Sequence, residues 1–167
     1  MIHLVTGGQR SGKSEYAEKL VLKRTENPVY LATSRIWDEN HKKRIDNHKA
    51  RRGKQWENIE EELNIGKFNF LNRVVLIDCI TLWLNNLFFD YNNDVDIALE
   101  LAKKEIDLLY KQNSEFIMVT NEIGLGGHPS NELAMKFTDL QGYVNQYIAQ
   151  KAETVTMLIS GIPLKVK

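Results

Sequence analysis

Short apolar runs alternate with longer amphipathic stretches along most of the chain. Five runs have the length and β-branched content of buried strands, at 2–5, 28–33, 73–78, 115–120 and 154–160. Three stretches place apolar residues at the intervals of three and four that amphipathic helices show, at 14–22, 95–111 and 131–150. A further helix is expected to start near Thr81, whereas 90–94 is a polar break typical of a surface loop. The alternation predicts an α/β domain with a mostly parallel central sheet.

A glycine-rich segment joins the first predicted strand to the first predicted helix. Residues 7–14 read GGQRSGKS and fit the pattern G-x-x-x-x-G-K-[ST]. Its backbone N–H groups and the helix N-terminus are expected to bind phosphate oxygens, with Lys13 on the β- and γ-phosphates and Ser14 on a Mg²⁺ ion. The alternative is a chance glycine-rich turn. The order of strand, loop and helix favours a phosphate-binding loop, and we expect a three-layer P-loop NTPase domain of the RecA-like type. The expected phosphate-loop contacts are Gly7, Gly8, Gln9, Arg10, Ser11, Gly12, Lys13 and Ser14.

Polar residues follow three of the other predicted strands. Ligands of open parallel sheets bind beyond the carboxyl ends of the strands, so Thr33, Asp78 and 120–122 are expected near the phosphate loop. Asp78 is expected to hold Mg²⁺ directly or through water. Its alternative role is to cap the following helix. The last two residues of 120–122 either orient substrate or only shape a local turn.

Length, charge and cysteine content narrow the class of protein. The 167 residues suit one domain, which we expect to span 1–167. The 22 basic residues balance 22 acidic ones, so no overall field attracts nucleic acid or an anionic membrane. The single cysteine, Cys79, excludes an internal disulfide and is expected to pack in the core. No apolar stretch approaches the roughly 20 residues of a membrane span, and no basic leader precedes the phosphate loop. These features predict a cytoplasmic protein with a small-molecule partner.

Cations are concentrated in the polar stretch 38–52, which is expected to be helical. On a helix, His41, Arg44, His48 and Arg51 follow intervals of three, four and three and share one face. Neighbouring positive charge disfavours imidazolium, which leaves a neutral nitrogen able to attack phosphorus while the cations stabilise phosphates. The alternative is a solvated basic face with an incidental histidine, and composition does not decide between the two.

Several segments carry motifs that occur together in one family. They read VTGGQRSGKS at 5–14, YLATS at 30–34, RIDNH at 44–48, DCITLWLNNL at 78–87, TNEIG at 120–124 and SGIPLK at 160–165, with Trp56 and Glu60 matching a W-x-T-x-E motif. In this combination the chain resembles the bifunctional adenosylcobinamide kinases and adenosylcobinamide-phosphate guanylyltransferases of cobalamin biosynthesis, over nearly its whole length. It departs from the family pattern at Gly53, Asn58 and 127–129, and at Asp78, where the family often has glutamate.

The resemblance implies two reactions at one nucleotide site. ATP or GTP phosphorylates adenosylcobinamide, and GMP is then transferred from GTP to adenosylcobinamide phosphate through a guanylyl-histidine intermediate. His48 is the implied nucleophile, and Lys13 is the other catalytic residue. The resemblance implies further nucleotide contacts at Thr33, Ser34, Arg35, Lys49, Ala50, Arg51, Arg52, Glu60 and Asp78. It also implies a homo-oligomer, commonly a trimer, for which an apolar helical face either forms an interface or belongs to the core; this face comprises Trp83, Leu84, Leu87 and Phe88.

Two other functions remain open at this point. In another small-molecule P-loop kinase, the basic stretch would only bind an anionic acceptor. In a GTP-binding switch or interaction module, the output would be a conformational change. The sequence lacks an N/T-K-x-D-type segment for reading guanine, which disfavours the switch.

Overall fold

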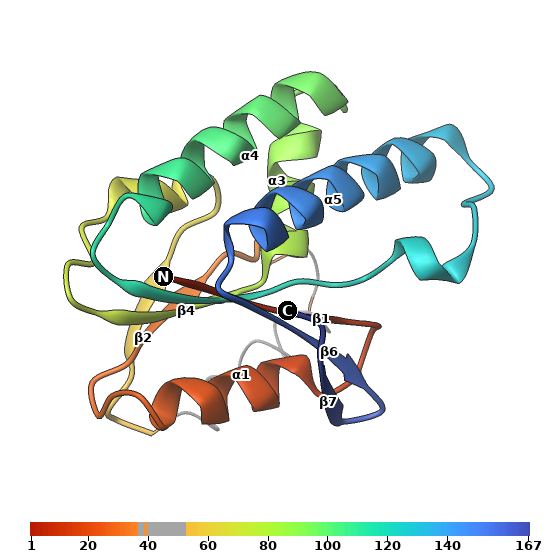
Figure 1. Cartoon of the computed structure of the whole chain (residues 1–167). Helices are drawn as coiled ribbons and strands as arrows, with labels where there is room; N and C mark the ends of the chain where they lie inside the picture. The colour runs from red at the N-terminus through yellow and green to blue at the C-terminus, as the bar shows by residue number, and fades with distance from the viewer. Residues whose placement is uncertain (37–38, 40–52) are drawn as a thin grey trace.

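The computed structural model of the chain describes residues 1–36, 39 and 53–167. Within these residues, a seven-stranded sheet with the order β3-β2-β4-β5-β1-β6-β7 forms the centre of the molecule (Figure 1). The strands are β1 (Ile2–Gly7), β2 (Val29–Ala32), β3 (Glu57–Glu60), β4 (Val74–Asp78), β5 (Glu115–Val119), β6 (Thr154–Ile159) and β7 (Ile162–Lys165). The helices are α1 (Lys13–Leu22), α3 (Ile80–Asp90), α4 (Val95–Tyr110) and α5 (Glu132–Lys151), with short 3-10 turns η1 (Ile65–Lys67) and η2 (Gly124–Gly126).

Helices cover both faces of this sheet. Figure 1 shows α1 on one face and α3, α4 and α5 on the other. Successive residues of a strand point to opposite faces, so Val75 and Ile77 pack with the core beneath α3 to α5, while Leu76 packs with the core beneath α1. The predicted three-layer α/β domain is therefore confirmed.

The order of the strands determines where the candidate site residues lie. The described strands pair in parallel except β6 with β7, which are antiparallel. β5 lies between β1, which leads into the phosphate loop, and β4, which ends in Asp78. This insertion separates the phosphate loop from Asp78 by one strand, and ligands of open α/β sheets bind beyond the carboxyl ends of the strands.

Two strands were not predicted, and both lie at edges of the sheet. β3 reads ENIE, and its burial is slight, so it lacks the apolar run that marks a buried strand. β7 contains Pro163 and follows a two-residue turn in which Ser160 and Gly161 both have positive φ, at 50° and 84°. The prediction that 154–160 is the last strand is therefore wrong. The Ser-Gly pair between apolar residues was the available signal for a hairpin.

The apolar face of α3 belongs to the core of this chain. Trp83, Leu84 and Phe88 are 0% exposed, and Leu87 is 3% exposed. The interpretation of these residues as an internal core face is confirmed, and the interface alternative is not. Cys79 is buried as predicted, but in the core beneath α1, and burial raises the pKa of its thiol to about 12. None of the described helices combines the length and apolarity required to cross a bilayer.

Candidate functional site

The phosphate loop takes its shape from backbone conformations that favour glycine. Gly7, at the end of β1, has φ 145°, and Gly12, the N-cap of α1, has φ 91°. A Cβ atom on Gly7 would lie 2.5 Å from the backbone oxygen of Leu158. Arg10 also has a positive φ, at 57°. The loop therefore turns sharply between β1 and α1, as a phosphate-binding loop requires.

Lys13 lies at the first turn of α1 and folds back along the loop. Its Nζ donates a 2.6 Å hydrogen bond to the Gly8 carbonyl, and the residue is only 7% exposed. Burial lowers the pKa of Lys13, while neighbouring Cys79 and Asp78 act in the opposite direction. The ammonium is thus held beside the loop amides, with Asp78 as a nearby anion.

The loop is also held from outside by two backbone hydrogen bonds. Gly161 N–H donates to the Ser11 carbonyl at 3.0 Å, and Glu122 N–H donates to the Gly7 carbonyl at 3.0 Å. One bond comes from the β6–β7 turn and the other from the segment after β5. The supporting role of Gly161 was not predicted, because it depends on the unpredicted hairpin.

The carboxyl ends of the parallel strands meet beside this loop. In the strand register, Ala32 is level with both Glu60 and Asp78, and Asp78 is level with Val119. Val119 is in turn level with Val5, just before the loop. The structure therefore brings the strand-end residues to the edge that carries the phosphate loop, as expected, although their roles toward a nucleotide stay predictions.

Asp78 carries a carboxylate with a fixed orientation at this edge. Its Oδ2 accepts a 3.0 Å hydrogen bond from the Tyr30 hydroxyl. Cys79 occupies the N-cap position of α3, and no side chain caps that helix, so the capping alternative for Asp78 is wrong.

The oxygens of Ser14 and Asp78 are of the kind that Mg²⁺ prefers. The described residues contain no group of three or more His, Cys, Asp or Glu side chains placed to hold a metal ion. A triphosphate-bound Mg²⁺ takes only one or two protein oxygens, with phosphates and water completing its shell. The hydroxyl and the carboxylate therefore fit a metal that arrives with the nucleotide.

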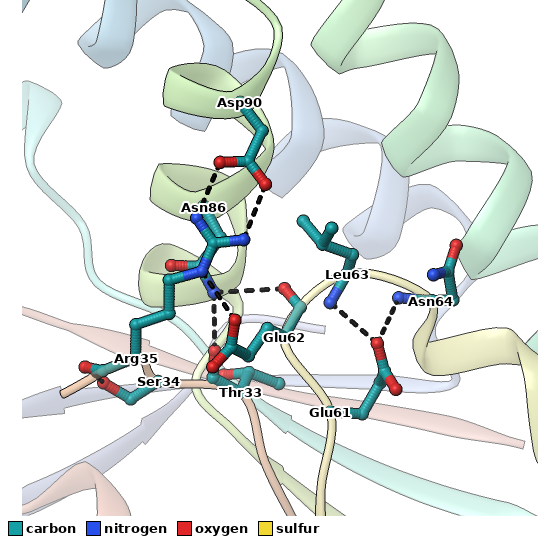
Figure 2. Close-up of polar contacts among 9 residues, drawn as sticks. All are labelled: Thr33, Ser34, Arg35, Glu61, Glu62, Leu63, Asn64, Asn86 and Asp90. Carbon is teal, nitrogen blue, oxygen red and sulfur yellow. Dashed lines mark hydrogen bonds and ion pairs between the residues drawn. The ribbon is translucent and has the colours of Figure 1, made fainter.

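The segment after β2 is bound to α3. The fully buried Thr33 donates its hydroxyl to the Cys79 carbonyl at 2.8 Å. Arg35 contacts Glu62 and Asp90, and these carboxylates raise the pKa of its guanidinium (Figure 2). Thr33 and Arg35 were both predicted to contact nucleotide, but their polar side-chain groups bond to other groups of the protein. Because the Arg35 guanidinium is paired with two carboxylates, this geometry disfavours the nucleotide contact predicted for it.

A buried polar network fixes the end of β5. Thr120 donates to Asn145 Oδ1 at 2.8 Å and accepts a 2.9 Å hydrogen bond from Gln141. Asn145 also donates to the Asn121 carbonyl, and the Asn121 N–H donates to Thr81 Oγ1. Sequence reasoning missed this role of α5. Its signal was a pair of amides four residues apart on an otherwise apolar helix face.

The remaining predicted site residues lie either near the strand ends or outside the residues that the structure describes. Ser34 donates its hydroxyl to the Arg35 carbonyl, and Glu60 is exposed at the end of β3. The predicted helix 38–52 and its site residues lie outside the described residues, apart from Glu39; these site residues are His48, Lys49, Ala50, Arg51 and Arg52.

Comparisons with known proteins match the whole chain. The family model described as CobU, cobinamide kinase / cobinamide phosphate guanyltransferase, matches residues 3–166. The chain is 39% identical over 183 residues to the bifunctional adenosylcobalamin biosynthesis protein CobU of Escherichia coli (strain K12), covering 100% of both chains. It is 36% identical over 172 residues to CobP of Pseudomonas aeruginosa, covering 100% of this chain and 98% of the relative.

Two further proteins are similar to the chain. CobU of Salmonella typhimurium is 36% identical over 182 residues, again over 100% of both chains. The crystal structure of the flagellar accessory protein FlaH from Methanocaldococcus jannaschii has a TM-score of 0.47 and 15% identity, covering 99% of this chain and 77% of that one.

Proposed function

The chain belongs to the cobinamide kinase / cobinamide phosphate guanyltransferase family, and from this membership we propose that it carries out both reactions at the phosphate-loop site. The first reaction phosphorylates adenosylcobinamide with ATP or GTP. The second transfers GMP from GTP to adenosylcobinamide phosphate and gives adenosyl-GDP-cobinamide. The observation that carries the proposal is a correctly folded phosphate loop within a family match that spans residues 3–166.

The kinase reaction uses the loop to stabilise charge. The aminopropanol hydroxyl of adenosylcobinamide attacks the γ-phosphorus and gives up its proton to solvent, and the bond from that phosphorus to the β–γ bridging oxygen breaks to release nucleoside diphosphate. Loop amides and the Lys13 ammonium bind the phosphate oxygens, on which negative charge is spread in the transition state. Ser14 and Asp78 would hold Mg²⁺, which when bound neutralises charge on the β- and γ-phosphates. Tyr30 orients the Asp78 carboxylate through its hydrogen bond.

The guanylyl transfer proceeds in two displacements. A neutral nitrogen of His48 attacks the α-phosphorus of GTP, and pyrophosphate leaves. GMP is then bonded to the imidazole as a phosphoramidate. A phosphate oxygen of adenosylcobinamide phosphate attacks the same phosphorus, the P–N bond breaks, and the imidazole is regenerated. The family match and the RIDNH segment at 44–48 support this assignment.

Incubation with α-labelled GTP tests the proposal. Wild-type protein is expected to acquire an acid-labile label that adenosylcobinamide phosphate removes. His48→Ala is expected to acquire none, while His41→Ala, which changes a histidine of the same basic stretch, keeps the label. No label on the wild type, or equal label on His48→Ala, would contradict the nucleophile. Phosphorylation of cobinamide without any label would instead indicate a kinase that lacks guanylyl transfer.

We also propose that the protein is a cytoplasmic homo-oligomer of three chains, as the family resemblance implies. The four α3 residues considered for the interface are buried within this chain, so another surface would form the contact. Light scattering of the purified protein measures the assembly mass and tests the oligomer directly.

A further inference from the structure

One buried amide joins two strand exits to α3. Asn86 is 0% exposed, and its Nδ2 donates to the Thr33 carbonyl at 2.8 Å and to the Glu62 carbonyl at 3.0 Å (Figure 2). Thr33 directly follows β2, and Glu62 lies two residues beyond the end of β3. Because both carbonyls bond to the same amide, the spacing between these exits is set by α3.

An ion-pair cluster joins the same three elements a second time. Arg35 Nε donates to Glu62 Oε2 at 2.6 Å. Its two terminal nitrogens donate to the two carboxylate oxygens of Asp90, both at 2.6 Å. Such a bidentate pair fixes orientation as well as distance. We call Arg35, Glu62, Asn86 and Asp90 the α3 clamp.

The charge of the α3 clamp favours a positioning role over phosphate binding. One guanidinium faces two carboxylates, so the cluster carries a net negative charge when both are ionised. Phosphates would be repelled by the carboxylates, and the guanidinium donors already have partners. The clamp therefore acts on the protein backbone around it.

One of the clamped exits leads into the segment assigned to guanylyl transfer. Residues 37–52 follow Ile36, so the β2 exit is where the chain departs toward His48. At its other end the segment rejoins the described chain at Gly53, ahead of the start of β3, which runs parallel to β2. The phosphate loop is instead held by backbone hydrogen bonds from Gly161 and Glu122. The two halves of the site thus have separate supports.

We propose that the α3 clamp is a positioning device for guanylyl transfer, with Asn86 and Asp90 as positioning residues that fix the β2 exit, from which the chain leads to His48. This inference rests on the proposed function. Misplacing a reacting group by about 1 Å costs up to roughly 10²-fold in rate. Loosening the clamp therefore slows guanylylation and leaves phosphoryl transfer, which depends on the phosphate loop, nearly unchanged.

The main test compares the two reactions in Asp90→Asn. We expect single-turnover labelling by α-labelled GTP to slow by about threefold to tenfold, while phosphorylation of cobinamide stays within about twofold. The matched control is Glu132→Gln, which removes the exposed 2.7 Å Lys136–Glu132 ion pair on α5 and should leave both rates unchanged. Asn86→Ala should give the same selective loss, and its thermal unfolding is measured in parallel. Since that variant leaves two carbonyls without a donor, Asp90→Asn carries the test if Asn86→Ala does not fold.

A double variant tests whether Arg35 acts through Asp90. If it does, Arg35→Gln combined with Asp90→Asn labels no more slowly than the slower single variant. Multiplied effects would overturn the clamp in favour of a direct nucleotide contact by Arg35. Equal losses of both activities in Asp90→Asn, or no change in labelling, would also overturn it. Absence of label on the wild type would instead refute the proposed function, which separates the two failures.

Discussion

The phosphate loop and the α3 clamp both lie at the carboxyl ends of the parallel strands, but they are built in opposite ways. The loop is one contiguous segment, shaped by the φ angles of Gly7 and Gly12 and supported by backbone hydrogen bonds. The clamp joins side chains far apart in the sequence, such as the pair Arg35 and Asp90, 55 positions apart. One half of the site depends on backbone conformation, and the other depends on side-chain charge and amide chemistry.

This difference has a functional consequence. Phosphoryl transfer needs mainly a triphosphate held in place, which the backbone of the loop provides. Guanylyl transfer adds a protein nucleophile, whose approach has to be positioned from outside the loop. Changes in the loop should therefore impair both reactions, and changes in the clamp should separate them.

The largest effect is expected from Lys13→Ala. The loss of the buried ammonium should lower both phosphorylation and labelling by at least about 10³-fold, because charge stabilisation on the phosphates is lost. Unfolding by urea should show little loss of stability, since the burial of Lys13 itself opposes its charge. Lys19→Ala, which removes only an exposed ion pair with Glu15, is the control. Normal labelling by Lys13→Ala would show that guanylyl transfer does not use the loop lysine.

A smaller effect, on stability, is expected from Gly7→Ala. The new Cβ would meet the Leu158 oxygen at 2.5 Å and Ser11 Oγ at 2.8 Å, at a φ of 145°. We expect the free energy of unfolding to fall by about 1–3 kcal/mol, together with weaker nucleotide binding. Gly8→Ala is the matched control for stability, because its Cβ would meet nothing within 4 Å. Equal urea midpoints for the two variants would show that the loop is not shaped by backbone strain at Gly7.

Sequence patterns predicted the parts of the fold that are local. The phosphate loop, the five apolar strands and the helices at 14–22, 95–111 and 131–150 all correspond to described elements within a few residues. β3 and β7 escaped prediction because edge strands need little apolar burial, and β7 includes Pro163. Their presence depends on pairing with β2 and β6, which no local pattern encodes.

The candidate site was predictable only where topology dictates it. The carboxyl ends of parallel strands meet at one edge, so the location of Thr33 and Asp78 followed from strand assignment alone. The partners of Arg35 did not, because Asp90 was interpreted as part of a surface loop, whereas it ends α3. Asn86 offered one signal, a polar residue at a core position of an apolar helix. Its two acceptors are backbone carbonyls, which no side-chain pattern specifies.

The smallest expected effect is a pH dependence of the free energy of unfolding, which distinguishes the α3 clamp from the phosphate loop. The hydrogen bonds from Arg35 lower the pKa of Asp90 below its ordinary value of 3.8. A carboxylate with a depressed pKa in the folded state adds stability above the unfolded pKa, and that stability is lost as pH falls through the folded value. The difference in unfolding free energy between wild type and Asp90→Asn should be about 0.5 kcal/mol or less at neutral pH, because solvent screens this partly exposed pair. Urea unfolding should show that difference shrinking below pH 3.8 and in high salt. A difference that persists in acid would mean that Asp90 supports α3 through packing, and that the clamp is not held by charge.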